Sequence, residues 1–188
     1  MNKIAIFASG SGSNAENIIK FFKNDPRNSV IGVFCNRPDA FVLERAKRLD
    51  IPAFVFNRED FYQSDRILSQ LNELGVDLIV LAGFLWKVPE AIIDAYDHRI
   101  INIHPALLPD YGGKGMYGMH VHESVIAAGE KESGITIHYV NNHYDEGAAI
   151  FQARCEVTPE DTPDSLAAKV HNLEYEYFPK VVKQVLEK

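Results

Sequence analysis

The chain is poor in the residue that builds disulfide frameworks and many structural metal sites. It has only two cysteines among 188 residues, and each stands alone in an apolar, strand-like run. A disulfide framework or a zinc site needs more cysteines at closer spacing. Since free cysteine is among the most often buried residue types, Cys35 and Cys155 are predicted to be reduced thiols in the core of a cytosolic protein.

Long hydrophobic runs and an excess of positive charge are also missing. No segment approaches the roughly 18 apolar residues that would span a membrane, and the run MNKIAIFASG is too short for a signal peptide. With 19 Lys and Arg against 26 Asp and Glu, the net charge is −7. This charge disfavours nucleic acid or an anionic membrane as the main partner. We expect a cytoplasmic monomer or homodimer that binds small molecules.

What is present is an alternation of apolar strands and amphipathic helices. The predicted order is strand 3–9, helix 14–24, strand 30–36, helix 40–50, strand 52–56, helix 62–75, strand 77–83, helix 89–96 and strand 99–104. Two strands, 134–140 and 148–157, then form a hairpin, and a helix from Thr162 closes the chain with an interruption near Pro179. The predicted fold is one α/β domain over residues 1–188: an open, mostly parallel, Rossmann-like sheet with helices on both faces and a C-terminal antiparallel hairpin.

A glycine loop, SGSGSN at residues 9–14, joins the first strand to the first helix. Exposed amides at the start of a helix favour a phosphate. Two features of a dinucleotide site are absent, because Ala15 replaces the third glycine of G-x-G-x-x-G and no acidic residue ends the second strand. The glycine loop is therefore predicted to bind a single phosphate, the alternative being a capped turn without a ligand.

The stretch INIH at residues 101–104 ends the fifth predicted strand with two polar side chains. Residues i and i+2 of a strand point to the same side, so Asn102 and His104 project together. Ligands of open α/β sheets bind at the carboxyl ends of the strands, where the glycine loop also lies. His104 can move a proton near neutral pH, and Asn102 can donate a hydrogen bond to an oxygen that gains charge. The pair is predicted to be catalytic rather than a structural buried histidine with its neighbour.

The turn HYDEG at residues 143–147 offers a carboxylate for that imidazole. Asp145 or Glu146 could orient and charge His104, because a nearby carboxylate favours the protonated form. An ordinary acidic turn is the alternative, and the residues alone leave these three possibilities open. The remaining histidine pairs match no zinc-binding pattern, so no metal is predicted.

Five stretches carry a resemblance to a known family. In order they are IFASGSGSN, DLIVLAGFL, IINIHPALLP, VHESVIAAGEKESGITIHYV and YDEGAAIFQ, and the resemblance runs from residue 3 to about residue 185. Asn-x-His-Pro-x-Leu-Leu-Pro with a downstream aspartate is typical of folate-dependent formyltransferases and formyl hydrolases. With the glycine loop, the chain resembles most specifically the members that formylate glycinamide ribonucleotide.

The resemblance implies transfer of the formyl group of 10-formyltetrahydrofolate to the amine of glycinamide ribonucleotide in purine biosynthesis, without a metal. The family's catalytic residues fall on Asn102, His104 and Asp145, with Asp145 keeping His104 charged beside an oxyanion. The family's other binding positions fall on Gly12, Ser13, Asn14 and Glu174 for the nucleotide, and on Arg58, Phe84, Leu85, Trp86, Lys87 and Val88 for the folate. A phosphate-binding half is expected over about residues 1–100, and a catalytic and folate-binding half over about residues 101–188.

Two features depart from the common family pattern. A long loop at residues 112–119, GGKGMYGM, exceeds that of the commonest members by several residues. We hypothesise that it acts as a lid, so trapping it closed should lower turnover; unchanged turnover would refute this. Trp86 stands where many members have arginine. Because that segment contacts the folate largely through its backbone, binding is expected to survive with altered stacking.

Three other functions compete with this interpretation. Methionyl-tRNA formyltransferase shares the catalytic motif but carries a further C-terminal domain and a basic tRNA surface. Formyltetrahydrofolate hydrolase normally carries an N-terminal regulatory domain, whereas the first strand here is expected from residue 3. A non-catalytic sensor of folate or nucleotide would not need Asn102, His104 and Asp145 together. A transferase acting on glycinamide ribonucleotide is therefore the expected function.

Overall fold

The computed structural model describes residues 1–187 and contains one seven-stranded sheet with the strand order β3-β2-β1-β4-β5-β6-β7. The sheet is open, mixed and mostly parallel, which confirms the predicted fold class. The chain divides into two compact units, the first being Met1–Ile101 with the segment from Val182 onward, the second Asn102–Val181. Within the described residues, no helix is long and apolar enough to cross a membrane.

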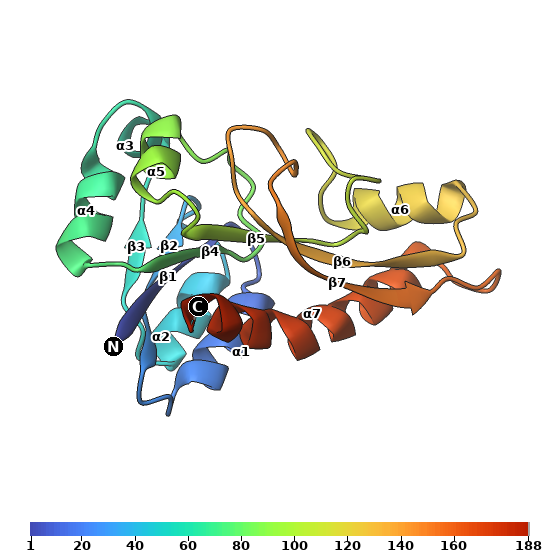
Figure 1. Ribbon diagram of the computed structural model, residues 1–188, viewed down its shortest axis with the longest axis horizontal. Coiled ribbons are helices and arrows are strands. Elements are labelled where there is room, and N and C mark those ends of the chain that lie inside the picture. Colours follow the sequence, from blue (N-terminus) through green and yellow to red (C-terminus); the bar gives the residue numbers. More distant parts are fainter. Residues whose placement is uncertain (188) are drawn as a thin grey trace. The chain divides into compact units, whose positions relative to one another are not determined.

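The first unit consists of parallel strands with helices on both sides (Figure 1). Its strands are β1 (Asn2–Ala8), β2 (Asn28–Cys35), β3 (Ala53–Val55) and β4 (Leu78–Leu81), with β1 pairing to β2 and β4, and β2 to β3. Its helices are α1 (Ser13–Phe22), α2 (Val42–Arg48), α3 (Arg58–Tyr62), α4 (Arg66–Leu74) and α5 (Glu90–Ala95). In Figure 1, α1 and α2 lie on one side of these strands, and α4 and α5 on the other. Parallel pairing places the turns after β1 and β4 at the same edge.

The core of the first unit is formed by strands that are buried on both faces. Ile4, Ile6 and Phe7 of β1 are each at most 1% exposed, as expected for a central parallel strand with helices on both sides. Phe7 stacks on Phe34 of β2, with ring centroids 4.9 Å apart. Burying two aromatic rings fixes the register of β1 and β2 and thereby the position of the glycine loop that follows β1.

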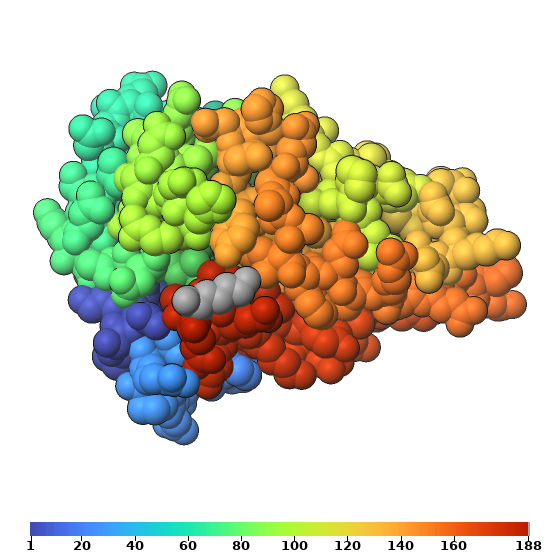
Figure 2. Space-filling view, viewed as in Figure 1, coloured from blue at the N-terminus to red at the C-terminus, as the bar shows by residue number. Residues whose placement is uncertain are grey.

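The second unit is built around an antiparallel hairpin. β5 (Ile100–His104) leads into it, followed by α6 (Met119–Ala127), β6 (Glu132–Tyr139), β7 (Ala149–Glu156) and α7 (Pro163–Leu186), whose last turns belong to the first unit. The register of β6 and β7 shifts between Ile137 and His138, so the chain bends where the hairpin turn begins. α7 keeps one side open to solvent, seen as the red surface of Figure 2.

Pro179 does not interrupt the last helix, so that prediction was wrong. α7 runs through Pro179 to Leu186. A proline removes one backbone hydrogen bond and crowds the preceding turn. Here Phe178 is fully buried and Val181 nearly so, and we infer that this apolar burial on both sides of Pro179 offsets the loss. The start was predicted correctly: the hydroxyl of Thr162 accepts a hydrogen bond from the Ser165 amide at 3.2 Å.

The helix predicted over 62–75 corresponds to α4, which begins only at Arg66, and neither α3 nor α6 was predicted. Asn57 and Asp60 form a capping box that starts α3 before the expected position. The Ser64 hydroxyl then donates to the Asp60 carbonyl at 3.0 Å, a local bond that competes with helix continuation. Gly75 ends α4 in the left-handed conformation, at φ 66°, as predicted from its position.

Candidate functional site

β5 presents two polar side chains on one side and apolar ones on the other. Ile101 and Ile103 point to one side and are 0% and 7% exposed. Strand alternation places Asn102 and His104 on the opposite side, where His104 is 3% exposed. A polar ring buried this deeply requires hydrogen-bond partners.

His104 meets an oxygen at each ring nitrogen. Its Nε2 lies 2.7 Å from the Tyr111 carbonyl oxygen, which can only accept, so Nε2 carries the proton. Its Nδ1 lies 3.6 Å from Oδ2 of Asp145, beyond a normal hydrogen bond. The neutral ring therefore has its lone pair on Nδ1, facing the carboxylate, and can take up a second proton there.

The charge of His104 differs from the expectation. Burial lowers the pKa of His104 below its usual value, although the Asp145 carboxylate and the Tyr111 carbonyl partly offset this. The imidazole is consequently neutral near pH 7 in the ligand-free protein. The family resemblance implied that Asp145 keeps the His104 ring charged. However, a ring that is only 3% exposed loses more hydration than one carboxylate at 3.6 Å can replace.

Asp145 is the hairpin carboxylate that faces His104. Its side chain is 13% exposed, and Oδ2 accepts a hydrogen bond from the Gly113 amide at 2.9 Å. Burial raises its pKa, but the His138 and His104 rings and the Gly113 amide outweigh this and hold the pKa of Asp145 below its usual range. Asp145 has a positive φ of 55°, a costly conformation for a non-glycine residue that the fold must enforce. Glu146 is exposed.

His138 is the fourth member of this group, and the sequence predicted it neither as a catalytic residue nor as a metal ligand. It is 2% exposed on β6, and its Nδ1 lies 2.8 Å from the Tyr139 carbonyl oxygen. That carbonyl places the proton on Nδ1, so Nε2 accepts a hydrogen bond from Nδ2 of Asn102 at 3.1 Å. The contact between Asn102 and His138 depends on β5 and β6 being neighbours in the sheet, which no local sequence pattern reveals. We call Asn102, His104, His138 and Asp145 the catalytic cluster.

Glu174 lies on the buried side of α7 in the same unit. It is 7% exposed and pairs with His171 one turn earlier, with Oε2 2.8 Å from Nδ1. Bonding to Glu174 raises the pKa of His171, as expected for an imidazole beside a carboxylate. In the part of the chain that the structure covers, no group of three or more histidine, cysteine or acidic side chains is arranged to hold a metal ion.

The glycine loop and the predicted folate segment are connected within the first unit. The Ser9 amide donates to the Gly83 carbonyl at 3.1 Å, and the Leu85 amide donates to the Ser9 hydroxyl at 3.0 Å. Gly12, at the cap of α1, has a φ of 74°, and a Cβ there would overlap the Val42 side chain. Only glycine meets both requirements.

The predicted folate segment borders an aromatic cluster. Phe84 packs edge-on against Phe7 at 5.3 Å between centroids, and the Arg58 guanidinium lies 5.0 Å from the Trp86 ring centroid. The structure thus brings Arg58 to Trp86, while Leu85 and Lys87 are exposed and Val88 is buried. Two polar backbone groups of this segment already have partners, since the Leu85 amide donates to the Ser9 hydroxyl and the Lys87 carbonyl accepts from the Tyr62 hydroxyl at 2.9 Å.

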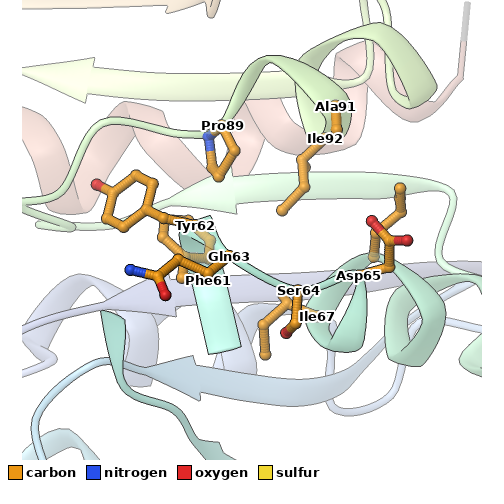
Figure 3. Close-up of a pocket in the computed structure, with 10 residues that line it drawn as sticks. Phe61, Tyr62, Gln63, Ser64, Asp65, Ile67, Pro89, Ala91 and Ile92 are labelled. Carbon is orange, nitrogen blue, oxygen red and sulfur yellow. The ribbon is translucent and has the colours of Figure 1, made fainter. Parts of the chain in front are cut away.

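A pocket of about 250 Å³ opens beside this segment (Figure 3). Phe61 and Tyr62 line it on one side, and Pro89 and Ile92 on another. None of the predicted folate residues is among its lining residues. The pocket therefore assigns no ligand to the segment.

Comparison with known proteins gives consistent matches along the whole chain. A family model described as formyl transferase matches residues 2–182. Phosphoribosylglycinamide formyltransferase of Bacillus subtilis is 38% identical, covering 99% of this chain and 95% of that protein. The chloroplastic enzyme of Arabidopsis thaliana is also 38% identical, over 98% of this chain but 65% of that longer protein. The crystal structure of glycinamide ribonucleotide transformylase 1 from Geobacillus kaustophilus matches with a TM-score of 0.90 at 36% identity, covering 99% of both chains.

Proposed function

The chain belongs to the formyl transferase family and acts as a phosphoribosylglycinamide formyltransferase of purine biosynthesis, and we propose that the catalytic cluster performs the transfer. The reaction moves a formyl group from a donor to the amine of glycinamide ribonucleotide. One observation carries the assignment of the cluster: two N–H donors and an ionised carboxylate converge at the end of β5, in a family whose chemistry creates an oxyanion.

Asn102 and His104 stabilise the tetrahedral intermediate. When the amine attacks the formyl carbon, the carbonyl oxygen gains negative charge. His138 holds one Nδ2 hydrogen of Asn102, which orients the amide so that the second hydrogen can be donated to that oxygen. The Nε2–H of His104 can do the same once it leaves the Tyr111 carbonyl. Asn102 is thus oriented before the reaction, which limits the reorganisation needed in the transition state, whereas His104 must first release the Tyr111 carbonyl.

Proton transfer uses the neutral resting state of His104. The amine must lose one proton, and the departing nitrogen of the donor must gain one. A neutral imidazole can accept the first, and the Asp145 carboxylate 3.6 Å from Nδ1 then stabilises the imidazolium. The imidazolium then gives its Nε2 proton to the leaving nitrogen while the Nδ1 proton stays beside Asp145, so protons balance without a covalent intermediate.

Substrate binding is assigned to the remaining family positions. The glycine loop, through Gly12, Ser13 and Asn14, takes the nucleotide phosphate, and buried Glu174 takes the amino end. The formyl donor is 10-formyltetrahydrofolate, held by the segment Phe84–Val88 and Arg58. What supports this is the exposure of Leu85 and Lys87 and the Arg58–Trp86 contact, because a flat pterin can stack on an aromatic or guanidinium face.

The test is an absorbance assay with glycinamide ribonucleotide and 10-formyltetrahydrofolate, each also omitted in turn. Tetrahydrofolate formed only when both are present supports the proposal. Product formed without the nucleotide would indicate a hydrolase, and no product would reject either the donor or the acceptor. Replacing the donor with another formylated cofactor then identifies which substrate was wrong.

We also propose that the enzyme acts in the cytoplasm as a monomer or homodimer. Both cysteines are free thiols, which suits a reducing compartment. Sedimentation equilibrium over a hundredfold concentration range would distinguish the two oligomeric states, and a larger species would contradict both.

A further inference from the structure

α2 holds the glycine loop from one side through two backbone carbonyls. The Val42 amide donates to the Gly10 carbonyl at 3.1 Å, and Nε of Arg45 donates to the Ser11 carbonyl at 2.8 Å. In a planar trans peptide, the C=O of one residue and the N–H of the next point in opposite directions. Fixing the Ser11 carbonyl on Arg45 therefore directs the Gly12 N–H away from α2.

The same arginine neutralises an acidic group near the start of α1. Glu16 lies in the first turn of α1 and is 7% exposed. Its carboxylate pairs with Lys20 at 2.6 Å, with Arg48 at 2.9 Å and with Nη1 of Arg45. These partners lower the pKa of Glu16 to about 2, with Lys20 making the largest contribution, although burial acts in the opposite direction. A carboxylate at this end of a helix would repel a bound phosphate if it were not offset, and here three cations surround one anion.

Of the cations that pair with Glu16, Arg45 also contacts the loop itself, through its bond to the Ser11 carbonyl. Its side chain is 23% exposed, compared with 60% for Arg48. Its guanidinium lies 5.0 Å from the Phe41 ring centroid, so packing restricts its orientation. One rigid guanidinium thus bonds the loop through Nε and Glu16 through Nη1, which the single ammonium of a lysine could not reproduce.

We propose that Arg45 is a positioning residue for the nucleotide phosphate. It aims the backbone of the glycine loop through the Ser11 carbonyl, and it offsets Glu16 so that the start of α1 attracts an anion. This inference rests on the proposed binding of the nucleotide phosphate at the glycine loop. On this inference, Arg45 of α2 contributes to nucleotide affinity but not to the rate of the chemical step.

The experiment compares Arg45→Met, Arg45→Lys and Arg48→Met in steady-state kinetics. Arg45→Met should raise KM for glycinamide ribonucleotide about tenfold, the scale of losing a charge-assisted hydrogen bond, with kcat and the donor KM within twofold of wild type. The KM of Arg45→Lys should lie between those of the wild type and Arg45→Met, since lysine keeps the charge but not the two N–H directions of the guanidinium. Arg48→Met removes a charge from Glu16 without touching the loop, and its KM should change less than twofold.

Three outcomes would overturn the inference: an unchanged nucleotide KM in Arg45→Met, an equal rise in Arg48→Met, or a fall in kcat instead of a rise in KM. Binding of ribose 5-phosphate, measured by calorimetry, separates this inference from the proposed function. If the wild type binds it and Arg45→Met binds it about tenfold more weakly, Arg45 has the stated role even if the reaction proves different. Thermal unfolding of each variant checks that folding is retained.

Discussion

The catalytic cluster and the glycine loop solve different problems with different parts of the chain. In the cluster, side chains are buried, oriented by one another and shifted in pKa. In the glycine loop, side chains are small, and the backbone is shaped by α2 and by a φ of 74° at Gly12. Side chains that move protons should control kcat, whereas a shaped backbone should control nucleotide affinity. The comparison gives four predictions.

The largest effect is expected from His104→Ala. Removing the proton carrier should lower kcat about a thousandfold, within the range for a general acid–base group, while the dissociation constant for glycinamide ribonucleotide stays within threefold. Rapid-quench turnover and calorimetry measure the two quantities. The matched control is His120→Ala, because His120 is exposed and pairs only loosely with Glu123 at 3.7 Å. Full activity in His104→Ala would remove that residue from the mechanism.

Asp145→Asn should lower kcat about a hundredfold and shift the pH profile. The carboxylate raises the pKa of His104 against the effect of burial, so an amide should let that pKa fall further. The neutral ring is the active form, and kcat/KM is lost as pH falls through the pKa of His104. The acid limb should therefore move to lower pH in Asp145→Asn. An acid limb that stays in place or moves to higher pH would contradict the assigned pairing.

His138→Ala should lower kcat about tenfold by releasing Asn102, with both KM values nearly unchanged. His138 contacts Asn102 by a hydrogen bond and Asp145 only at 3.6 Å, so most of its effect should pass through Asn102, and the double variant Asn102→Ala/His138→Ala should be little slower than Asn102→Ala alone. Additive losses in this double-mutant cycle would show that His138 has a separate role.

Gly12→Ala is expected to leave kcat within threefold but raise the nucleotide KM about tenfold. A Cβ at position 12 overlaps the Val42 side chain, and the alanine backbone must adopt a φ of 74°. The free energy of unfolding should therefore also fall by about 1–3 kcal/mol. Gly10→Ala is the control, because a Cβ at Gly10 has no neighbour within 4 Å. A KM unchanged in Gly12→Ala would show that the loop shape does not govern nucleotide affinity.

The long loop at residues 112–119 and its neighbour Tyr111 contact the catalytic cluster. Its neighbour Tyr111 gives a carbonyl to His104, and Gly113 gives an amide to Asp145. Under the lid hypothesis, the loop would hydrogen-bond to His104 and Asp145 until the substrate takes its place. Trapping the loop with a crosslink and measuring turnover remains the test of that hypothesis.

The sequence alone was enough for much of the fold and for the principal residues of the candidate site. Apolar strand runs and a 3.6-residue period determined the α/β class, and strand alternation determined that Asn102 and His104 share a side. The Asn-x-His-Pro motif and the glycine loop were sufficient to indicate the family. These properties are local, because each depends on residues a few positions apart.

Only the tertiary structure decided which groups meet and how they are charged. The choice of Asp145 over Glu146, the contact of His138 with Asn102, and the bond from Arg45 to Ser11 each join distant segments. The neutral state of His104 depends on the sum of burial and one carboxylate, which no local pattern contains. The passage of α7 through Pro179 was likewise settled by apolar burial on both sides of that residue. Periodicity predicts elements, but packing determines distance and hydration, and these set the chemistry of the site.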